Sequence, residues 1–316
     1  MNYSPPTFSE IQTAAERIAP FAEITPVLTN SAISEMAGTE LFFKCENFQK
    51  VGAFKFRGAC NAVLSLRDKD AAKGVATHSS GNHAAALALA GKIREISVHV
   101  VMPDNAPKVK IRAVEGYGAK ITFCKPTLEA REATLNRVKN ETGAIVIHPY
   151  NDERIIAGQG TVALEFLQEY PELDTIIAPI GGGGLISGTC VAAKGTHPDI
   201  AIIGAEPKGA DDAFQSLIKG EIVPQTNPKT IADGLLTSLG DKTFPIIQEH
   251  VEKILTVSEE GIVKAMRLIW ERMNIIVEPS SAVVLAALLE HPEERIGSHV
   301  GLILTGGNAD LDNLPW

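Results

Sequence analysis

The chain has 316 residues, of which 45% are hydrophobic and 21% charged, and its formal net charge is −9. This composition is typical of a globular protein with one large or two moderate domains, and it excludes wholesale disorder and the basic character of a nucleic-acid-binding protein. The sequence contains no run of about 18 apolar residues, so no membrane span is predicted. The N-terminal MNYSPPTFSE lacks the pattern of a signal peptide, and the four cysteines form no CxxC pair. We therefore expect a cytoplasmic protein without a disulfide framework or a zinc ribbon.

Short β-branched segments alternate with longer helical patterns along the chain. The expected strands are residues 41–45, 74–78, 97–102, 120–123, 144–147, 175–178, 201–205, 253–256 and 301–304. The expected helices include residues 84–92, 108–117, 128–141, 161–170 and 261–273. This alternation, with strands that lack a polar face, predicts an α/β fold of parallel sheets covered by helices on both sides.

The segment 73–147 contains four strand–helix alternations and is expected to form a small α/β domain. Residues 1–72 and 148–316 would then form a larger, discontinuous domain. Ligands of open α/β sheets bind at the carboxyl ends of the strands. Unusual residues that follow the expected strands therefore indicate the candidate site.

Four consecutive glycines, 181–184, follow one strand and lead into a helix. A glycine loop that feeds a helix N-terminus is suited to bind an anion, most often phosphate. The loop is not a Walker motif, and no frame places a GxGxxG, although Glu206 ends the next strand as in dinucleotide-binding enzymes. A phosphate site is favoured over a merely flexible turn.

Three other segments carry unusual residues at strand ends or in apolar surroundings. The motif SSGNH at 79–83 offers hydroxyls and free N–H groups for a carboxylate, or it only caps a helix. Lys55 stands between two phenylalanines, which depress the pKa of an amine and favour a Schiff base with an aldehyde, unless it is a surface charge. Thr305 follows the last strand with further free amide groups, or the segment is a plain turn.

A phosphate cradle, a reactive lysine, a carboxylate cradle and a hydroxyl at a strand end are together what pyridoxal phosphate and an amino-acid substrate require. In these features the chain resembles the fold-type II pyridoxal-phosphate enzymes, in particular the group of serine racemase, serine/threonine dehydratase and 3-hydroxyaspartate ammonia-lyase. The resemblance rests on GAFKFRGA (52–59), SSGNH (79–83), HPYND (148–152), AGQGT (157–161), GGGGLISG (181–188), GAEP (204–207), ADD (210–212), IADG (231–234), EPSSA (278–282) and LTGGN (304–308).

The resemblance implies a tryptophan-synthase-β-like fold, in which the cofactor binds in the cleft between two open parallel-sheet domains and the smaller domain is mobile. It implies that Lys55 binds pyridoxal phosphate covalently. The other implied cofactor residues are Phe54, Asn82, Gly181, Gly182, Gly183, Gly184, Gly234, Glu278 and Thr305. A neutral hydroxyl such as that of Thr305 against the pyridine nitrogen favours rapid elimination or reprotonation over transamination.

The resemblance also implies substrate and metal sites. Ser79, Ser80, Asn82 and His83 would bind the substrate carboxylate, and Ser80 would act as acid and base on the face opposite Lys55. Glu206, the carbonyl of Ala210, and Asp212 match a site for Mg²⁺, Ca²⁺ or Mn²⁺. The spacing alone would equally suit a helix N-terminus beginning near Ala213. A homodimer is a further implication.

The chain departs from the family pattern at several positions. Ala53 replaces a serine, and Ala84 and Ala85 replace Gly-Gln. Tyr150 stands where the nucleotide-activated racemase has an asparagine, which argues against activation by ATP. The sequence ends eleven residues after Thr305, so we expect no C-terminal regulatory domain.

The candidate substrates are serine, threonine and 3-hydroxyaspartate. The C-terminal GGNADLDNLPW resembles that of the 3-hydroxyaspartate ammonia-lyases, and a second substrate carboxylate needs a cation, for which Arg131 is the first candidate and Arg154 the second. We expect dehydration of 3-hydroxyaspartate to oxaloacetate and ammonia, with serine racemisation or dehydration as the alternative. β-Replacement as in cysteine synthase, a non-catalytic pyridoxal-phosphate-binding protein and a dinucleotide oxidoreductase are weaker alternatives.

Overall fold

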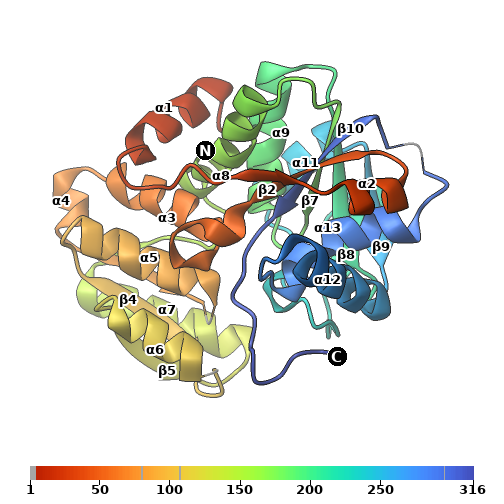
Figure 1. Ribbon diagram of the computed structural model, residues 1–316. Coiled ribbons are helices and arrows are strands. Elements are labelled where there is room, and N and C mark those ends of the chain that lie inside the picture. The colour runs from red at the N-terminus through yellow and green to blue at the C-terminus, as the bar shows by residue number, and fades with distance from the viewer. Residues whose placement is uncertain (1–4, 80, 107, 295) are drawn as a thin grey trace.

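The computed structural model describes residues 5–79, 81–106, 108–294 and 296–316, and it contains two separate β-sheets (Figure 1). The strands are β1 (Val27–Thr29), β2 (Glu40–Cys45), β3 (Val75–His78), β4 (Val98–Pro103), β5 (Lys120–Cys124), β6 (Ile145–Val146), β7 (Thr175–Pro179), β8 (Ala201–Pro207), β9 (Lys253–Val257) and β10 (His299–Leu304). The α-helices are α1 (Phe8–Ile18), α2 (Ser31–Ala37), α3 (Lys55–Leu64), α4 (Asp68–Ala71), α5 (Asn82–Ile93), α6 (Lys108–Gly116), α7 (Leu128–Thr142), α8 (Glu153–Glu169), α9 (Gly184–Thr196), α10 (Asp212–Lys219), α11 (Phe244–His250), α12 (Glu259–Met273) and α13 (Pro279–Glu290). Short 3₁₀ helices are η1 (Glu46–Phe48), η2 (Lys50–Gly52) and η3 (Asp233–Leu235).

The larger sheet has six strands in the order β1-β2-β10-β7-β8-β9. All its neighbours are parallel except β1 and β2, which pair antiparallel. The sequence predicted the parallel sheets but not the antiparallel edge strand β1. A three-residue strand carries too little periodicity to be recognised from the sequence.

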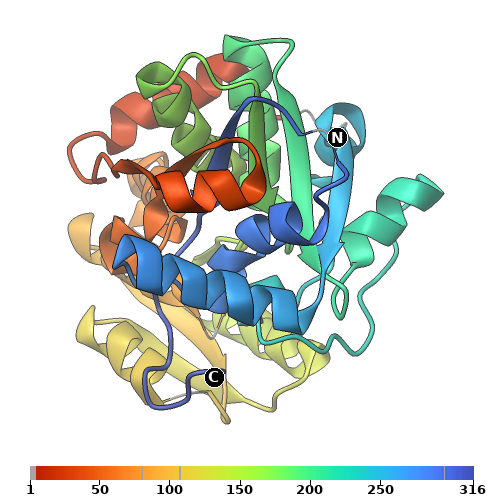
Figure 2. The same cartoon turned by 45° about the vertical axis from the view of Figure 1, so that its right-hand side comes forward.

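Both faces of the larger sheet are covered by helices because neighbouring strand residues point to opposite sides. Phe42, Ile176 and Ile202 pack with α1, α8, α9 and α11 in one core. Phe43, Ile177 and Ile203, each one residue further along, pack with α2, α12 and α13 in another. Figure 2 shows α12 in front of this sheet.

The smaller sheet has four parallel strands in the order β5-β4-β3-β6, all of which lie between residues 75 and 146. Val75, Val98 and Val100 point towards α5 and α6, whereas Ala76 and Val101 point towards α7. In Figure 1 this sheet and its helices lie below and to the left of the larger sheet. Among the described residues, no helix is both long and apolar enough to cross a bilayer.

Local sequence signals account for several helix ends. The Thr7 hydroxyl accepts a hydrogen bond from the Glu10 N–H, and the Glu10 carboxylate in turn accepts one from the Thr7 N–H, which fixes the start of α1. The Thr127 hydroxyl accepts a hydrogen bond from the Ala130 N–H at the start of α7, and Gly143 ends the helix with φ +71°.

Candidate active site

Lys55 is the first residue of α3, and the turn before it is fixed to the end of β10. The Phe54 N–H donates to the carbonyl oxygen of Thr305 at 3.0 Å, and Ala53 forms an isolated β-bridge with Gly306. Two segments that are 250 residues apart in the chain therefore meet beside the lysine. This contact places the sequence-predicted Lys55 and Thr305 at one site.

The Lys55 amine lies in a largely apolar environment. Its Nζ donates to the carbonyl oxygen of Pro149 at 3.1 Å and lies 5.0 Å from the centroid of the Phe54 ring. Burial lowers the pKa of Lys55 to about 8, although the nearby Glu278 carboxylate raises it. A substantial fraction of the amine is therefore unprotonated near pH 8, as a nucleophile or a base requires.

The tetraglycine loop connects β7 to α9. Within the part of the chain that the structure describes, the backbone N–H groups of Gly181, Gly182 and Gly183 donate no hydrogen bond. A Cβ on Gly182 would lie 2.3 Å from the Tyr150 ring, and Gly183 has φ +87°. The loop thus presents free donors at a helix N-terminus, which is suited to a phosphate.

Pro149 and Tyr150 connect the lysine to this loop. Pro149 accepts the Lys55 hydrogen bond, and the adjacent Tyr150 packs against Gly182 and Gly184. The sequence-predicted Gly234 belongs to the same region, since its carbonyl oxygen would lie 3.0 Å from a Cβ on Gly181.

Thr305 is 4% exposed and directly follows β10, with its hydroxyl in a hydrogen-bond network. Its Oγ1 lies 3.0 Å from the Ser281 Oγ, which also donates to the Gly306 carbonyl and accepts from the Gly306 N–H, each at 2.7 Å. Ser281 therefore fixes the orientation of the Thr305 hydroxyl.

Asn82 and Glu278 form a polar pair near Lys55. The Asn82 Nδ2 donates to the Glu278 Oε1 at 2.9 Å, and the Asn82 Oδ1 accepts from the Asn308 Nδ2 at 2.9 Å. Burial, together with the Asp233 carboxylate, raises the pKa of Glu278 to about 7. Asn82 is the first residue of α5, and the Ser79 Oγ accepts from the Gly81 N–H at 3.3 Å in the turn before it.

Ser80, which the sequence analysis assigned an acid–base role, lies outside the described residues. His83 is 2% exposed. Its Nε2 lies 3.4 Å from the Ile147 carbonyl oxygen, and its Nδ1 has no partner among the described residues. Burial holds the pKa of His83 well below its usual range, so this ring is neutral.

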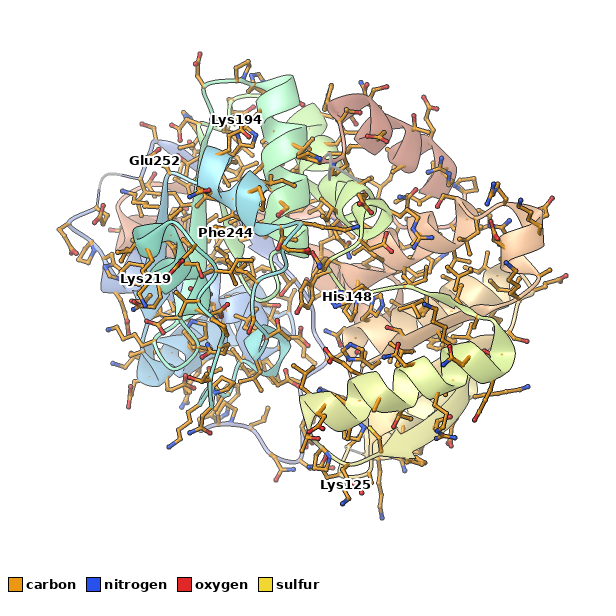
Figure 3. All side chains as sticks on the ribbon, turned by 180° about the vertical axis from the view of Figure 1, so that it is seen from behind. Lys125, His148, Lys194, Lys219, Phe244 and Glu252 are labelled. Atoms are coloured by element: carbon orange, nitrogen blue, oxygen red, sulfur yellow. The ribbon has the colours of Figure 1, made fainter. Side chains whose placement is uncertain are left out.

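A wall of neutral aromatic rings lies beside the lysine. The His148 ring contacts the Tyr150 ring edge-on, with centroids 4.5 Å apart, and the His78 ring at 5.9 Å. Burial lowers the pKa of His148 to about 4, and its Nδ1 accepts from the backbone N–H of Asn151 at 2.9 Å. Figure 3 labels His148 at the centre of the molecule, between the lobe with Lys125 and the part with Phe244.

The two arginine candidates have different surroundings. Arg154 forms an ion pair with Asp152 at 2.5 Å, which occupies its guanidinium. Arg131 is partly buried on α7, and its Nε has no hydrogen-bond partner among the described residues. The pKa of His78 is lowered mainly by burial and in addition by the charge of Arg131. Only Arg131 thus combines a place beside the wall of rings with an unpartnered guanidinium N–H.

The candidate metal residues form a separate cluster. Glu206 at the end of β8 is fully buried, and its carboxylate accepts from the N–H groups of Ala213 at 3.2 Å and Phe214 at 2.8 Å. Asp212 is 3% exposed and accepts from the Leu239 N–H at 3.0 Å. Ala210, 1% exposed, lies in the turn between them.

This cluster caps the start of α10 and also offers oxygen atoms of the kind that bind a cation. Burial raises the pKa of Glu206 well above its usual range, and the charge of Asp212 adds to this. Neither carboxylate forms an ion pair with a residue that the structure describes. The carboxyl oxygens and a nearby carbonyl are the ligand types that Mg²⁺ and Ca²⁺ prefer.

Several residues at this site were missed from the sequence. Ser281 lay within the EPSSA motif, but nothing in the motif indicated a contact with Thr305. Thr243 donates to the carbonyl oxygen of Gly182 at 2.8 Å, and no motif contains it. Pro149 and Tyr150 belong to HPYND, whose contact with the glycine loop only the fold reveals.

Comparison with known proteins agrees with these features. A family model described as pyridoxal-phosphate dependent enzyme matches residues 18–306. A serine racemase of Dictyostelium discoideum is 51% identical over 312 residues, which cover 98% of this chain and 96% of that protein. A β-hydroxyaspartate dehydratase of Paracoccus denitrificans is 52% identical over 311 residues, which cover 98% of this chain and 99% of that protein. The solved structure of maize serine racemase has a TM-score of 0.96 and 48% identity, and it covers 98% of this chain and 95% of its own.

Proposed function

The chain belongs to the family of pyridoxal-phosphate-dependent enzymes, and on this premise we propose that it eliminates water from 3-hydroxyaspartate to yield oxaloacetate and ammonia. The proposal is carried by Arg131, whose guanidinium is partly buried beside His78 with an unpartnered Nε. A buried N–H without an acceptor is costly, and a second carboxylate on the substrate would satisfy it.

Pyridoxal phosphate, when bound, supplies the electron sink for charge that develops at the substrate Cα. We assign its phosphate to the N–H groups of residues 181–184 and its pyridine nitrogen to the Thr305 hydroxyl. Phe54, Asn82, Gly234 and Glu278 complete the assigned cofactor contacts.

We assign to Lys55 the role of the base that removes the α-proton of the substrate. Its Nζ accepts the proton from Cα, the β-carbon–oxygen bond breaks, and the hydroxyl takes the proton from Nζ and leaves as water. The resulting double bond between Cα and Cβ belongs to an enamine, which takes up water and releases ammonia and the keto acid. The backbone N–H groups near Ser79, Asn82 and His83 are assigned to the substrate α-carboxylate.

The test compares oxaloacetate and pyruvate release by the purified holoenzyme from the isomers of 3-hydroxyaspartate, L-serine and L-threonine. We expect Arg131→Gln to lower kcat/KM for 3-hydroxyaspartate by about 30- to 100-fold, since a charged hydrogen bond is lost, and to change kcat/KM for serine far less. Arg137→Gln is the matched control, because Arg137 lies on the same helix and pairs with Glu141 in solvent. Equal losses on both substrates would remove Arg131 from the substrate site.

Serine racemisation and dehydration form the second candidate function. The relatives named serine racemase support it, and Ser80 of the SSGNH motif is the residue assigned to reprotonate Cα from the face opposite Lys55. D-Serine and pyruvate as the main products would establish this alternative over hydroxyaspartate dehydration.

We also propose a divalent-cation site formed by Glu206, the Ala210 carbonyl and Asp212, with Mg²⁺ as the first candidate. The support is two buried carboxylates without an ion-pair partner in the described part of the chain. Treatment with a chelator should lower the Tm, and Mg²⁺ should restore it. A Tm that responds to neither would refute the site.

The remaining assignments concern the whole protein. We propose that residues 73–147 form a mobile domain, that residues 1–72 and 148–316 form the larger one, and that the protein is a cytoplasmic homodimer. Ile24, Phe48 and Ile276 are exposed apolar side chains that support a dimer surface, and the Asn47 amide donates to the Ile276 carbonyl. Sedimentation equilibrium of the full chain tests the dimer.

A further inference from the structure

A short segment, residues 239–243, connects the proposed cation site to the tetraglycine loop. At one end the Leu239 N–H donates to the Asp212 Oδ2 at 3.0 Å. At the other end the Thr243 Oγ1 donates to the carbonyl oxygen of Gly182 at 2.8 Å. Figure 3 labels Phe244, the residue that follows this segment.

The segment is a tight turn whose ends are buried, while Asp241 in its middle is exposed. The Gly240 N–H donates to the Thr243 Oγ1 at 3.0 Å, and the Gly240 carbonyl accepts from the Thr243 N–H at 3.2 Å. A Cβ on Gly240 would lie 2.2 Å from the Asn151 Oδ1, so the backbone fits closely against its neighbour. Hydrogen bonds at both ends of this turn therefore connect Asp212 to the Gly182 carbonyl through residues 239–243.

Thr243 fixes the orientation of a peptide group in the glycine loop. Because a trans peptide is planar, the carbonyl of Gly182 and the N–H of Gly183 point in opposite directions. With that carbonyl held by Thr243, which is fully buried, the Gly183 N–H points away from Thr243 and lacks a partner among the described residues. Gly183 itself allows no side chain here, since a Cβ would lie 2.7 Å from the Thr243 Oγ1.

We propose that Thr243 is a positioning residue that couples divalent-cation binding at Glu206 and Asp212 to the affinity of the glycine loop for the cofactor phosphate. The inference rests on the cation site and phosphate site of the proposed function. A bound cation holds the two like-charged carboxylates together and keeps Asp212 on the Leu239 N–H. The turn then holds the Gly182 carbonyl, and the free N–H groups of the loop are preorganised for phosphate.

The experiment measures the Kd of pyridoxal phosphate for the full-length protein by dialysing holoenzyme against graded cofactor concentrations, with chelator or with Mg²⁺. We expect Mg²⁺ to lower the Kd by about 10-fold, which is within the usual range of coupling between two sites. The same dialysis against pyridoxal, which lacks the phosphate, should show a ratio near 1. Binding of Mg²⁺ is measured separately from its effect on the Tm.

Substitution of Thr243 tests the route of the coupling. Thr243→Val keeps the shape but removes the hydroxyl and should reduce the effect of Mg²⁺ on the Kd to near 1, whereas Thr243→Ser should retain it. Thr243→Ala replaces the valine variant if that variant does not fold. The matched control is Thr189→Val on α9, because Thr189 is also fully buried and its Oγ1 has no partner among the described residues.

The possible results distinguish failure of the coupling through Thr243 from failure of the cation site itself. A Mg²⁺-dependent Kd that is lost in Thr243→Val and kept in Thr189→Val supports the coupling. If Mg²⁺ raises the Tm but leaves the Kd unchanged, the cation site stands and the coupling is wrong. If Thr243→Val retains the full Mg²⁺ effect, the route is wrong, and if Mg²⁺ changes neither Tm nor Kd, the cation site and the coupling both fail.

Discussion

Lys55 carries a prediction about pH, because burial lowers its pKa from 10.5 to about 8. Only the unprotonated amine attacks the cofactor aldehyde, and below its pKa the unprotonated fraction falls about tenfold per pH unit. We expect the rate at which the cofactor-free protein takes up pyridoxal phosphate to rise with pH and to level off above about pH 8. Absorbance after rapid mixing measures this rate.

Pyridoxine phosphate, which has no aldehyde, is the control for this measurement and should bind without the same rise. An uptake rate that keeps increasing towards pH 10.5 would mean that the amine has the pKa of an exposed lysine.

Gly182 carries a second prediction at the residue scale. An added Cβ would lie 2.3 Å from the Tyr150 ring, a distance that no side chain tolerates, so Gly182→Ala must displace the tyrosine or the loop. We expect a loss of about 1–3 kcal/mol in the free energy of unfolding together with weaker cofactor retention, as for other overpacked sites. Urea denaturation and cofactor absorbance after dialysis measure the two effects.

Tyr150→Ala in the same chain should restore part of both losses by removing the ring that collides. Gly116→Ala, where the added Cβ meets nothing within 4 Å, is the control and should be tolerated. If the double variant is no better than Gly182→Ala alone, the loss does not arise from the collision with Tyr150.

At the scale of elements, buried ion pairs connect η1, α3 and α8. Arg57 on α3 is 3% exposed and pairs with Glu46 at 2.8 Å and with Glu165 of α8 at 2.5 Å. Arg57→Met would leave the buried Glu46 carboxylate without its ion pair, whereas Glu165 would keep its pair with Lys44. We therefore expect the free energy of unfolding to fall by about 3–5 kcal/mol. Arg267→Met, which breaks an exposed pair with Glu271, should change it by less than about 1 kcal/mol.

Urea denaturation decides this prediction. Similar small losses in both variants would mean that the buried pairs contribute no more than a surface pair, and that α3 is held by its apolar contacts alone.

Strands and helices with a clear period were predicted from the sequence within a few residues, as the expected strand 120–123 and the observed β5 illustrate. The helix expected at 161–170 instead starts at Glu153, since AGQGT contains glycines that weaken a helical prediction. The fold places these glycines where helices touch: a Cβ on Gly158 would lie 2.6 Å from the Cα of Gly58. Close packing of α3 and α8 outweighs local propensity, and such long-range packing is not visible in a local pattern.

The candidate site follows the same division. The sequence singled out Lys55 and the tetraglycine loop because residues of these types are chemically unusual in their positions. Ser281 and Thr243 were not, because each is an ordinary buried hydroxyl whose partner lies far away in the chain. Such contacts between distant hydroxyl and backbone groups form only when the chain folds, so a single sequence does not indicate them.

At the scale of the molecule, an ion pair between Lys110 of α6 and Asp233 of η3 connects the part with the smaller sheet to the part with the larger sheet. Both side chains are partly exposed, so the pair contributes little to the stability of the fold. If residues 73–147 move as a domain, however, the pair favours the closed arrangement. Lys110→Met should therefore shift the protein towards opening while its Tm stays nearly unchanged.

Hydrogen exchange distinguishes opening from unfolding. In Lys110→Met we expect faster exchange in η3, which faces the smaller sheet, but unchanged exchange in β4 at its core, and substrate should restore the slow exchange in η3. Lys120→Met, at the exposed start of β5, is the control and should leave both segments unchanged. Faster exchange in β4 as well would mean that the smaller sheet unfolds locally, and the rigid-body motion would then be wrong.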